Sequence, residues 1–309
     1  MSQPSGQSIN LRFLEYFTVL CRERHFARAA EACGVTQPTL SAGITALEEL
    51  LGKRLILRDR RFAGLTAEGE AMLPWAQRLL ADHEALRQAV DAKSGALKGE
   101  LRLGVIPASM PAVGYLARRI QLRNPEVRLN VRSMTSREIE RGLLEYELDA
   151  GLTYLHNEPL AQVTGMTLYH EYYRFAARAD SALGQRRAVE WEEVAQLPIC
   201  LLHRGMQNRR ILDAHLMTRG LDIVPKVTAD SYVTLLSLVE ASGLYSILPH
   251  SYAALLPASG NVRLIDFVDP APPNEIGLVV LEREPRSSMA RAALVAAREL
   301  ASDGLFEDI

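Results

Sequence analysis

The chain has 309 residues, of which 48% are hydrophobic, 23% charged and 6% aromatic, a composition typical of a globular protein with a buried core and not of a disordered or fibrous chain. Its length suits two or three domains, and its cysteines, Cys21, Cys33 and Cys200, lack the spacing of a disulfide framework or a zinc site. The net charge of −2 is unevenly distributed, because residues 1–65 hold nine Lys or Arg against six Asp or Glu. This local excess of basic side chains suits a nucleic-acid-binding segment near the N-terminus.

Three helices are predicted in close succession near the N-terminus. Apolar side chains recur at helical spacing over 13–21, and an alanine-rich helix over 26–33 stops at a glycine. Thr36 can cap a third helix over 37–51, in which Pro38 lies in the first turn, where its missing N–H is tolerated. A helix, a tight turn and a second helix form the helix-turn-helix arrangement.

A wing and a long helix are predicted next. The segment 53–61, KRLILRDRR, places five basic side chains around a short β-prone core, which indicates a β-hairpin. Thr66 can cap a helix over 67–93 that would be roughly 40 Å long at 1.5 Å per residue. Its apolar stripe alternates spacings of four and three residues, the heptad pattern of a dimerising helix. The stripe comprises Met72, Ala76, Leu79, His83, Leu86 and Val90.

A hinge over 94–99 separates these elements from a segment of different character. Strands are predicted at 101–106, 127–131, 149–153, 199–202 and 244–248, with a further strand after 275. Helices are predicted at 112–123, 136–146, 207–219, 231–242 and 287–301. The alternation indicates an α/β domain with a mostly parallel sheet covered by helices. We divide the domain, residues 100–309, into lobe I, about 100–168 and 268–309, and lobe II, about 169–267.

The segment from Arg24 to Glu70, RHFARAAEACGVTQPTLSAGITALEELLGKRLILRDRRFAGLTAEGE, resembles the N-terminal signature of the LysR-type family of bacterial transcriptional regulators. The matching features are Ala29-Ala30, Thr36-Gln37-Pro38, Ser41, Leu47-Glu48, Gly52, Arg58 and Leu65-Thr66. The resemblance implies a winged helix-turn-helix over 1–66, the linker helix, and a two-lobed, periplasmic-binding-protein-like effector domain. It also implies a homodimer or homotetramer that binds promoter DNA, responds to a small effector and works with RNA polymerase.

Side chains at the start of the third predicted helix suit base-edge contacts in the major groove. Gln37 can pair bidentately with adenine, Thr39 offers a methyl group and a hydroxyl, and Ser41 can hold a phosphate or a base edge. Thr36 and Pro38 belong to the same predicted DNA-binding set. Helix-start chemistry is the alternative for Gln37 and Thr39, and it is our first interpretation of Pro38.

Arginines near this helix suit phosphate or minor-groove contacts, with a solvated basic face as the alternative. They are Arg28 on the second helix and Arg58, Arg60 and Arg61 in the wing. Relatives often carry long polar side chains where this chain has Gly43 and Thr45, so we expect fewer base contacts or a different operator.

Open parallel sheets bind ligands at the carboxyl ends of their strands, helped by helix N-termini. Applied to the predicted strands, this rule indicates an effector site made of Ser109, Met110, Thr135, Tyr154, His203 and Tyr245. The hydroxyls of Ser109 and Thr135, next to helix starts, suit a carboxylate effector. For each residue the alternative is a capping or loop-packing role.

The sequence disfavours three other functions. The N-terminal segment resembles most the peroxide-sensing branch of the family, but residues 202–215 lack the cysteine pair of that branch, so a redox switch at Cys200 is disfavoured. Nucleotide-binding, metalloprotease and hydrolase motifs are missing, which disfavours an enzyme and predicts neither cofactor nor metal. A solute-binding protein is disfavoured by the basic helix-turn-helix and by the polar start, which predict a cytoplasmic protein without membrane contact.

Overall fold

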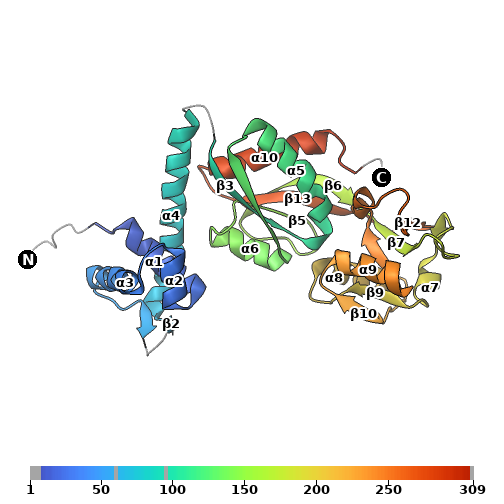
Figure 1. The fold of residues 1–309 in the computed structure, drawn as a ribbon, viewed down its shortest axis with the longest axis horizontal. Helices are drawn as coiled ribbons and strands as arrows, with labels where there is room; N and C mark the ends of the chain where they lie inside the picture. Colours follow the sequence, from blue (N-terminus) through green and yellow to red (C-terminus); the bar gives the residue numbers. More distant parts are fainter. Residues whose placement is uncertain (1–7, 59–61, 94–96, 307–309) are drawn as a thin grey trace, which may run out of the picture. The chain divides into compact units, whose positions relative to one another are not determined.

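The computed structural model describes residues 8–58, 62–93 and 97–306. The chain forms two compact units, residues 1–93 and 94–309 (Figure 1). Each unit has its own buried apolar core. No helix within the described ranges is long and apolar enough to cross a membrane.

The N-terminal unit contains the predicted helix-turn-helix, wing and long helix. Its elements are α1 (Leu11–Glu23), α2 (Phe26–Ala32), α3 (Gln37–Leu51), β1 (Ile56–Arg58), β2 (Phe62–Leu65) and α4 (Ala67–Lys93). Strands β1 and β2 pair antiparallel, with Ile56 opposite Leu65. These predicted elements are therefore confirmed within a few residues.

Local chemistry sets the ends of α3 and α4 as the sequence predicts. Thr36 Oγ1 accepts a hydrogen bond from the Thr39 backbone N–H, and Gly52 ends α3 in the left-handed conformation at φ 63°. Thr66 Oγ1 accepts from the Gly69 N–H at 3.0 Å and caps α4. A Cβ on Gly69 would lie 2.2 Å from the Leu55 carbonyl oxygen, so the start of α4 packs directly on the backbone before the wing.

A buried carboxylate fastens α3 to the wing. Glu48 is 4% exposed, and its Oε1 accepts hydrogen bonds from the backbone N–H groups of Leu55 at 2.9 Å and Ile56 at 3.2 Å. Arg54 contacts the other carboxylate oxygen at 3.4 Å. Because buried backbone donors need partners, these bonds fix the start of the hairpin relative to α3.

The C-terminal unit contains two sheets. The sheet of lobe I has the order β4-β3-β5-β13-β6, and that of lobe II the order β10-β9-β11-β7-β12-β8. The elements of lobe I are β3 (Gly99–Val105), η1 (Pro107–Ser109), α5 (Met110–Arg123), β4 (Val127–Ser133), α6 (Ser136–Leu144), β5 (Ala150–Tyr154), β6 (Val163–Glu171), β13 (Asn274–Leu281) and α10 (Ser288–Ser302). Those of lobe II are β7 (Tyr173–Arg178), β8 (Ala188–Val189), α7 (Trp191–Val194), β9 (Ile199–Leu202), α8 (Gln207–Thr218), β10 (Val227–Ala229), α9 (Tyr232–Ser242), β11 (Tyr245–Pro249), η2 (His250–Leu255) and β12 (Val262–Phe267).

The two lobes are joined where β6 ends and β7 begins, at Tyr172, and again between β12 and β13. In lobe I, α5 and α10 pack on each other over one face of the sheet, and α6 covers the other face (Figure 1). The apolar core continues from lobe I into lobe II and includes Cys200 and Leu202 of β9. The ends of strands from both lobes therefore meet around one buried region.

The expectation of a mostly parallel sheet is wrong, because both sheets are mixed. Strand β3 is parallel to β4 and β5, but β13 is antiparallel to β5 and β6. In lobe II, β7 is antiparallel to β11 and β12. Strands β6, β7 and β12 were not predicted. Strand β6 carries Gly165 and Glu171 and alternates irregularly between buried and exposed positions, so it lacks the apolar run typical of a core strand.

Candidate functional site

The first turn of α3 presents an exposed polar face. Gln37, Pro38 and Thr39 are exposed, whereas the opposite face is buried against the core of the unit. The buried face comprises Leu40, Ile44 and Leu47. An amphipathic helix whose first turn faces solvent has the geometry by which recognition helices enter a major groove.

The threonine hydroxyls of this turn already have hydrogen-bond partners, whereas within the described ranges the side-chain amide of Gln37 does not. Thr36 Oγ1 and Thr39 Oγ1 lie 2.8 Å apart and hydrogen bond to each other, so both contribute to the cap. The side-chain amide of Gln37 has no partner among the described residues. Ser41, one turn later, is half-buried. Gln37 is therefore the side chain of this face best able to bond a base edge.

Helix packing explains why position 43 is a glycine, which the sequence alone did not indicate. It is buried, and a Cβ at this position would lie 2.6 Å from the ring of Tyr16 and 3.0 Å from that of Phe13. The interpretation of Gly43 as a lost base contact is therefore wrong, because the residue faces α1 and allows the two helices to pack closely. Thr45 is half-buried.

The structure describes the contacts of Arg28, but the side chains of the wing arginines lie outside the described residues. Arg28 is exposed, and its Nη2 donates to the carbonyl oxygen of Glu23 at 2.7 Å, which ties α2 to the end of α1. His25 caps α2 by accepting from the Arg28 N–H. Arg60, Arg61 and the side chain of Arg58 lie outside the described residues, as does the start of the predicted hinge.

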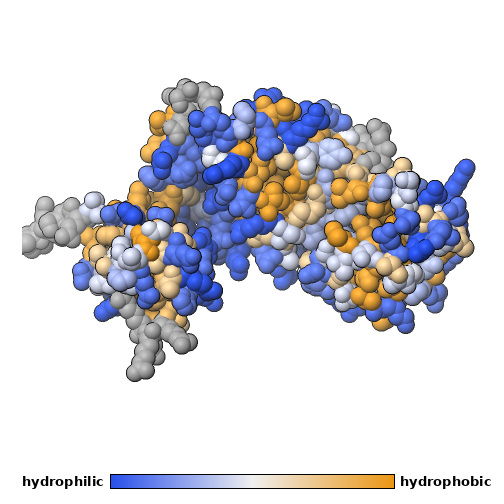
Figure 2. Space-filling view, viewed as in Figure 1, coloured by the Kyte–Doolittle hydropathy of each residue, from blue (hydrophilic) through white to orange (hydrophobic). Residues whose placement is uncertain are grey.

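The apolar stripe of α4 is used in two ways. Ala76 is 1% exposed and belongs to the core of the N-terminal unit, against which Met72 also packs. Further along, Leu79, Leu86 and Val90 are 47%, 63% and 65% exposed. Figure 2 shows apolar surface along α4. The predicted stripe therefore starts in the core and ends as an uncovered apolar ridge.

A buried acid lies where the two lobes meet. Glu171, the last residue of β6, is fully buried, and its Oε1 accepts from Tyr154 Oη at 2.7 Å and from Asn208 Nδ2 at 3.1 Å. Burial raises the pKa of Glu171 to about 8, so its carboxyl is mostly protonated and uncharged at neutral pH. Tyr154 comes from lobe I and Asn208 from lobe II, so the acid is bonded to both lobes.

Several hydroxyls and amides surround Glu171. Burial, together with the charge that Glu171 would carry, raises the pKa of Tyr154, Tyr173 and Tyr232, which therefore remain hydroxyl donors. In the described part of the chain, buried atoms without a hydrogen-bond partner include Glu171 Oε2, Gln207 Nε2 and Tyr232 Oη. Such orphaned polar atoms are costly unless water or a ligand completes them.

Two further contacts join the lobes beside this cluster. Ser136, at the start of α6, bonds to Gln207 of α8, and Thr153 Oγ1 donates to Ser136 Oγ at 3.1 Å. Arg210 of α8 forms a two-pronged ion pair with Glu158 of lobe I, with both N–O distances at 2.7 Å. This pair lowers the pKa of Glu158 and keeps it charged.

The structure places the predicted effector residues in different surroundings. Ser109 and Tyr154 are buried at the lobe junction, and Met110 is half-buried beside Ser109. Thr135 forms a capping box with Glu138, so its hydroxyl is used within α6. Gln207, Asn208 and Glu171, which sequence reasoning missed, complete the cluster.

His203 and Tyr245 do not join the cluster. His203 is exposed and accepts a local hydrogen bond from the Gly205 N–H at 3.0 Å. Tyr245 stacks on Phe175 in the separate core of lobe II. Strand register explains why Tyr245 lies away from the cluster, because it pairs with Ile199 at the amino end of β9. Ligands of open parallel sheets bind at the carboxyl ends of the strands.

The cysteines are free thiols. Cys200 is fully buried in β9, with its Sγ 3.3 Å from the Tyr245 carbonyl oxygen. Burial raises the pKa of the Cys200 thiol. Because the thiolate is the reactive form, this environment makes Cys200 a poor nucleophile.

Comparison with known proteins agrees with this architecture. Residues 11–70 match the bacterial regulatory helix-turn-helix protein family model, lysR family, and residues 94–302 match the LysR substrate binding domain. A probable hydrogen peroxide-inducible genes activator of Streptomyces viridosporus is 31% identical over 289 residues, covering 92% of this chain and 90% of that protein.

Solved structures share the fold over nearly the whole chain. A full-length OxyR variant from Pseudomonas aeruginosa superposes with a TM-score of 0.74 at 25% identity, covering 95% of this chain and 98% of that one. Full-length CbnR complexed with its target DNA gives a TM-score of 0.67 at 20% identity, covering 94% and 99%. This chain therefore belongs to the LysR family and is a DNA-binding transcriptional regulator with an effector-binding domain.

Proposed function

We propose that the exposed first turn of α3 reads the operator and that Gln37 makes the base contact that discriminates sequence. Thr39 and Ser41 contribute neighbouring contacts, and Arg28 with the wing arginines Arg58, Arg60 and Arg61 neutralises phosphates. The observation that carries this proposal is the exposed, unpartnered amide of Gln37 on the face opposite the buried side of α3.

The Gln37→Ala variant tests this assignment. Loss of a bidentate amide–adenine contact costs about 1–3 kcal/mol at one base position, so affinity for the operator should fall while affinity for shuffled DNA stays unchanged. Gln121→Ala, the same change at an exposed position of α5, is the matched control and should leave both affinities unchanged. Equal loss on operator and shuffled DNA for Gln37→Ala would remove Gln37 from the specificity-determining residues.

We infer that the exposed ridge of α4 pairs two chains. Leu79, Leu86 and Val90 recur at intervals of seven and four residues and are uncovered in the single chain, which is the condition for heptad pairing. A two-fold pair would present two recognition helices to half-sites roughly 34 Å apart, or a multiple of that distance. Pairing of the effector domains would then give a homotetramer. Such a regulator acts on the chromosome, which places it in the cytoplasm.

The lobe junction is the proposed effector site, and its chemistry favours an uncharged ligand. The acid at its centre, Glu171, is kept neutral by burial. The buried arginine of α8, Arg209, is already bonded to Asp213 and to the Leu202 carbonyl oxygen. A carboxylate entering here would face an ionisable acid and no unpaired buried cation among the described residues. Hydroxyl and amide donors without partners suit a small, oxygen-rich, neutral molecule instead.

A thermal-shift comparison of polyols, amides and lactones with their carboxylate counterparts tests this effector class. A ligand at 100 times its Kd adds about 2.7 kcal/mol of stability. We expect neutral compounds to stabilise the protein, with Tyr154→Phe removing the effect and Tyr115→Phe, at an exposed tyrosine of α5, preserving it. Stabilisation by carboxylates that Tyr154→Phe abolishes would overturn this assignment.

The redox alternative has less support. It would require Cys200 to ionise and find a partner, but the thiol is buried and its pKa is raised. The other cysteines, Cys21 and Cys33, belong to the N-terminal unit, and burial raises the pKa of both thiols. The effector response is therefore assigned to ligand binding between the lobes.

A further inference from the structure

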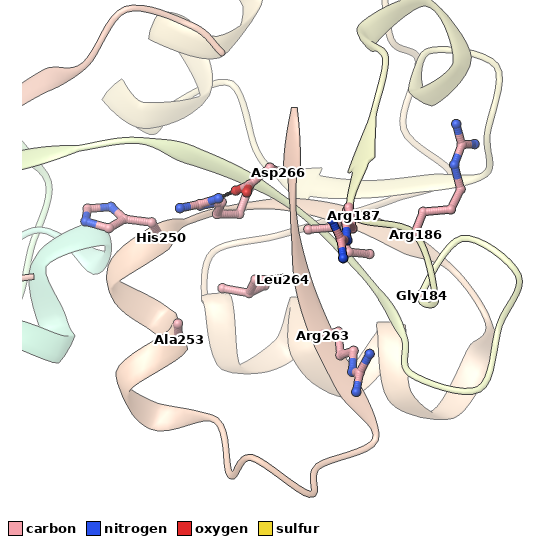
Figure 3. Close-up of a pocket in the computed structure, with 10 residues that line it drawn as sticks. Gly184, Arg186, Arg187, His250, Ala253, Arg263, Leu264 and Asp266 are labelled. Carbon is pink, nitrogen blue, oxygen red and sulfur yellow. Dashed lines mark ion pairs between the residues drawn. The ribbon is translucent and has the colours of Figure 1, made fainter. Parts of the chain in front are cut away.

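A second polar site lies within lobe II, where β7, β8 and β12 approach η2. It is a cavity of about 270 Å³, and four of its ten lining residues are arginines (Figure 3). Arg174 comes from β7, Arg186 and Arg187 from the segment before β8, and Arg263 from β12. We call these four side chains and their cavity the arginine pocket.

The charges of the arginine pocket do not cancel. Asp266, the one acid among the lining residues, forms an ion pair with Arg174 (Figure 3). Arg186 Nη1 reaches the two oxygens of Glu193 at 2.6 and 2.8 Å. Arg187 and Arg263 have no side-chain partner within the described ranges. Two positive charges therefore remain uncompensated around one small cavity.

The segment that carries Arg186 and Arg187 is held in place by its own hydrogen bonds. Ser181 Oγ donates to the Arg178 carbonyl oxygen at 2.7 Å and accepts from the Gly184 N–H at 3.0 Å. A Cβ on Gly184 would lie 1.9 Å from that carbonyl oxygen, so the turn requires glycine. The two arginines thus start from an ordered turn, which reduces the entropy lost when a ligand binds.

We propose that the arginine pocket binds a small dianion, either a phosphate monoester or a dicarboxylate, at a site separate from the lobe junction. Two uncompensated guanidinium groups match a ligand of charge −2, and their planar forks bond phosphate and carboxylate oxygens in pairs. The volume lies just below the range of about 300–1,000 Å³ found for sites of drug-sized ligands, so the ligand is small. An anion in the cavity is attracted by both guanidinium groups, which lack an acidic partner of their own within the described ranges.

Isothermal titration of the full chain at constant ionic strength tests the site, with inorganic phosphate and succinate as probes. We expect at least one probe to bind. The Arg187→Gln and Arg263→Gln variants should each weaken binding about tenfold or more, because a charged hydrogen-bond partner is lost, and the double variant should abolish it. Arg298→Gln, at an exposed arginine of α10, is the matched control and should bind as the wild type does.

The outcomes separate the ligand classes. Binding of phosphate alone identifies a phosphate monoester site, binding of succinate alone identifies a dicarboxylate site, and binding of both shows recognition of charge; each supports the proposal. Absence of binding by both probes at millimolar concentration, or equal affinities in the double variant and the wild type, would overturn it. Thermal midpoints without anion should agree among all variants, since the substituted side chains are exposed. Gln37→Ala should bind the anion normally, so this test is independent of operator recognition.

Discussion

Replacing Glu171 by Gln should flatten the pH dependence of stability. In the unfolded chain this carboxyl ionises near its ordinary value of 4.5, whereas in the fold its pKa is about 8. Between these values the folded protein holds a proton that the unfolded chain has released, so this group makes the free energy of unfolding fall as the pH rises. Across this pH range the group lowers the free energy of unfolding by at most about 5 kcal/mol, at about 1.4 kcal/mol per pH unit.

Gln is a close mimic of the protonated acid, because its carbonyl oxygen can accept from Tyr154 and Asn208 as Oε1 does. Urea unfolding followed by the fluorescence of the buried Trp191, measured between pH 5 and 8.5, gives the comparison. Wild type and Glu171→Gln should have similar stability at pH 5, and the variant should become the more stable one by several kcal/mol at pH 8.5. Glu190→Gln, at an exposed site, should run parallel to the wild type. A Glu171→Gln curve parallel to the wild type over the whole range would refute the reasoning.

Three further predictions concern packing and the thiol. Gly43→Ala should destabilise the N-terminal unit by about 1–3 kcal/mol, because the new Cβ would meet Tyr16 at 2.6 Å; Gly114→Ala, at a helical glycine with open space around it, should be neutral or stabilising in the same thermal unfolding assay. Glu48→Ala should lower the free energy of unfolding by about 2–5 kcal/mol, since it leaves two buried N–H groups unpaired. A variant that keeps the wild-type thermal midpoint and becomes sensitive to protease only in the wing would show instead that the effect of Glu48 is local. Cys200→Ser should leave DNA binding insensitive to peroxide, as in the wild type, and a peroxide response present only in the wild type would restore the redox alternative.

The N-terminal elements could be predicted because local signals determine them. The cap at Thr36, Pro38 in the first turn and the apolar spacing of α3 act within one helix, so the sequence alone indicates its bounds and its exposed face. The burial of Gly43 could not be predicted, because it depends on where the ring of Tyr16 lies after α1 and α3 pack.

The residues of the proposed effector site were only half predictable for a similar reason. Ser109 and Tyr154 follow from the rule on strand ends, whereas Glu171 is placed by the unpredicted strand β6, and Asn208 reaches it from lobe II across the packed junction. A signal for Glu171 was present, since an acid among closely spaced tyrosines, LYHEYY, is unusual in a strand. Tyr245 was misplaced because strand direction and register decide which end of β11 faces the site.

The most direct test of sequence-specific recognition by α3 is the salt dependence of binding to a genomic fragment selected by the wild-type protein. Affinities for that fragment and for a shuffled duplex would be measured at about 50 and 200 mM salt, over which several phosphate contacts change affinity by orders of magnitude. We expect both affinities to fall steeply with salt while the selected fragment stays the tighter ligand. Binding that is insensitive to salt, or equal for the two duplexes under all conditions, would contradict the assignment of α3 as the operator-reading helix.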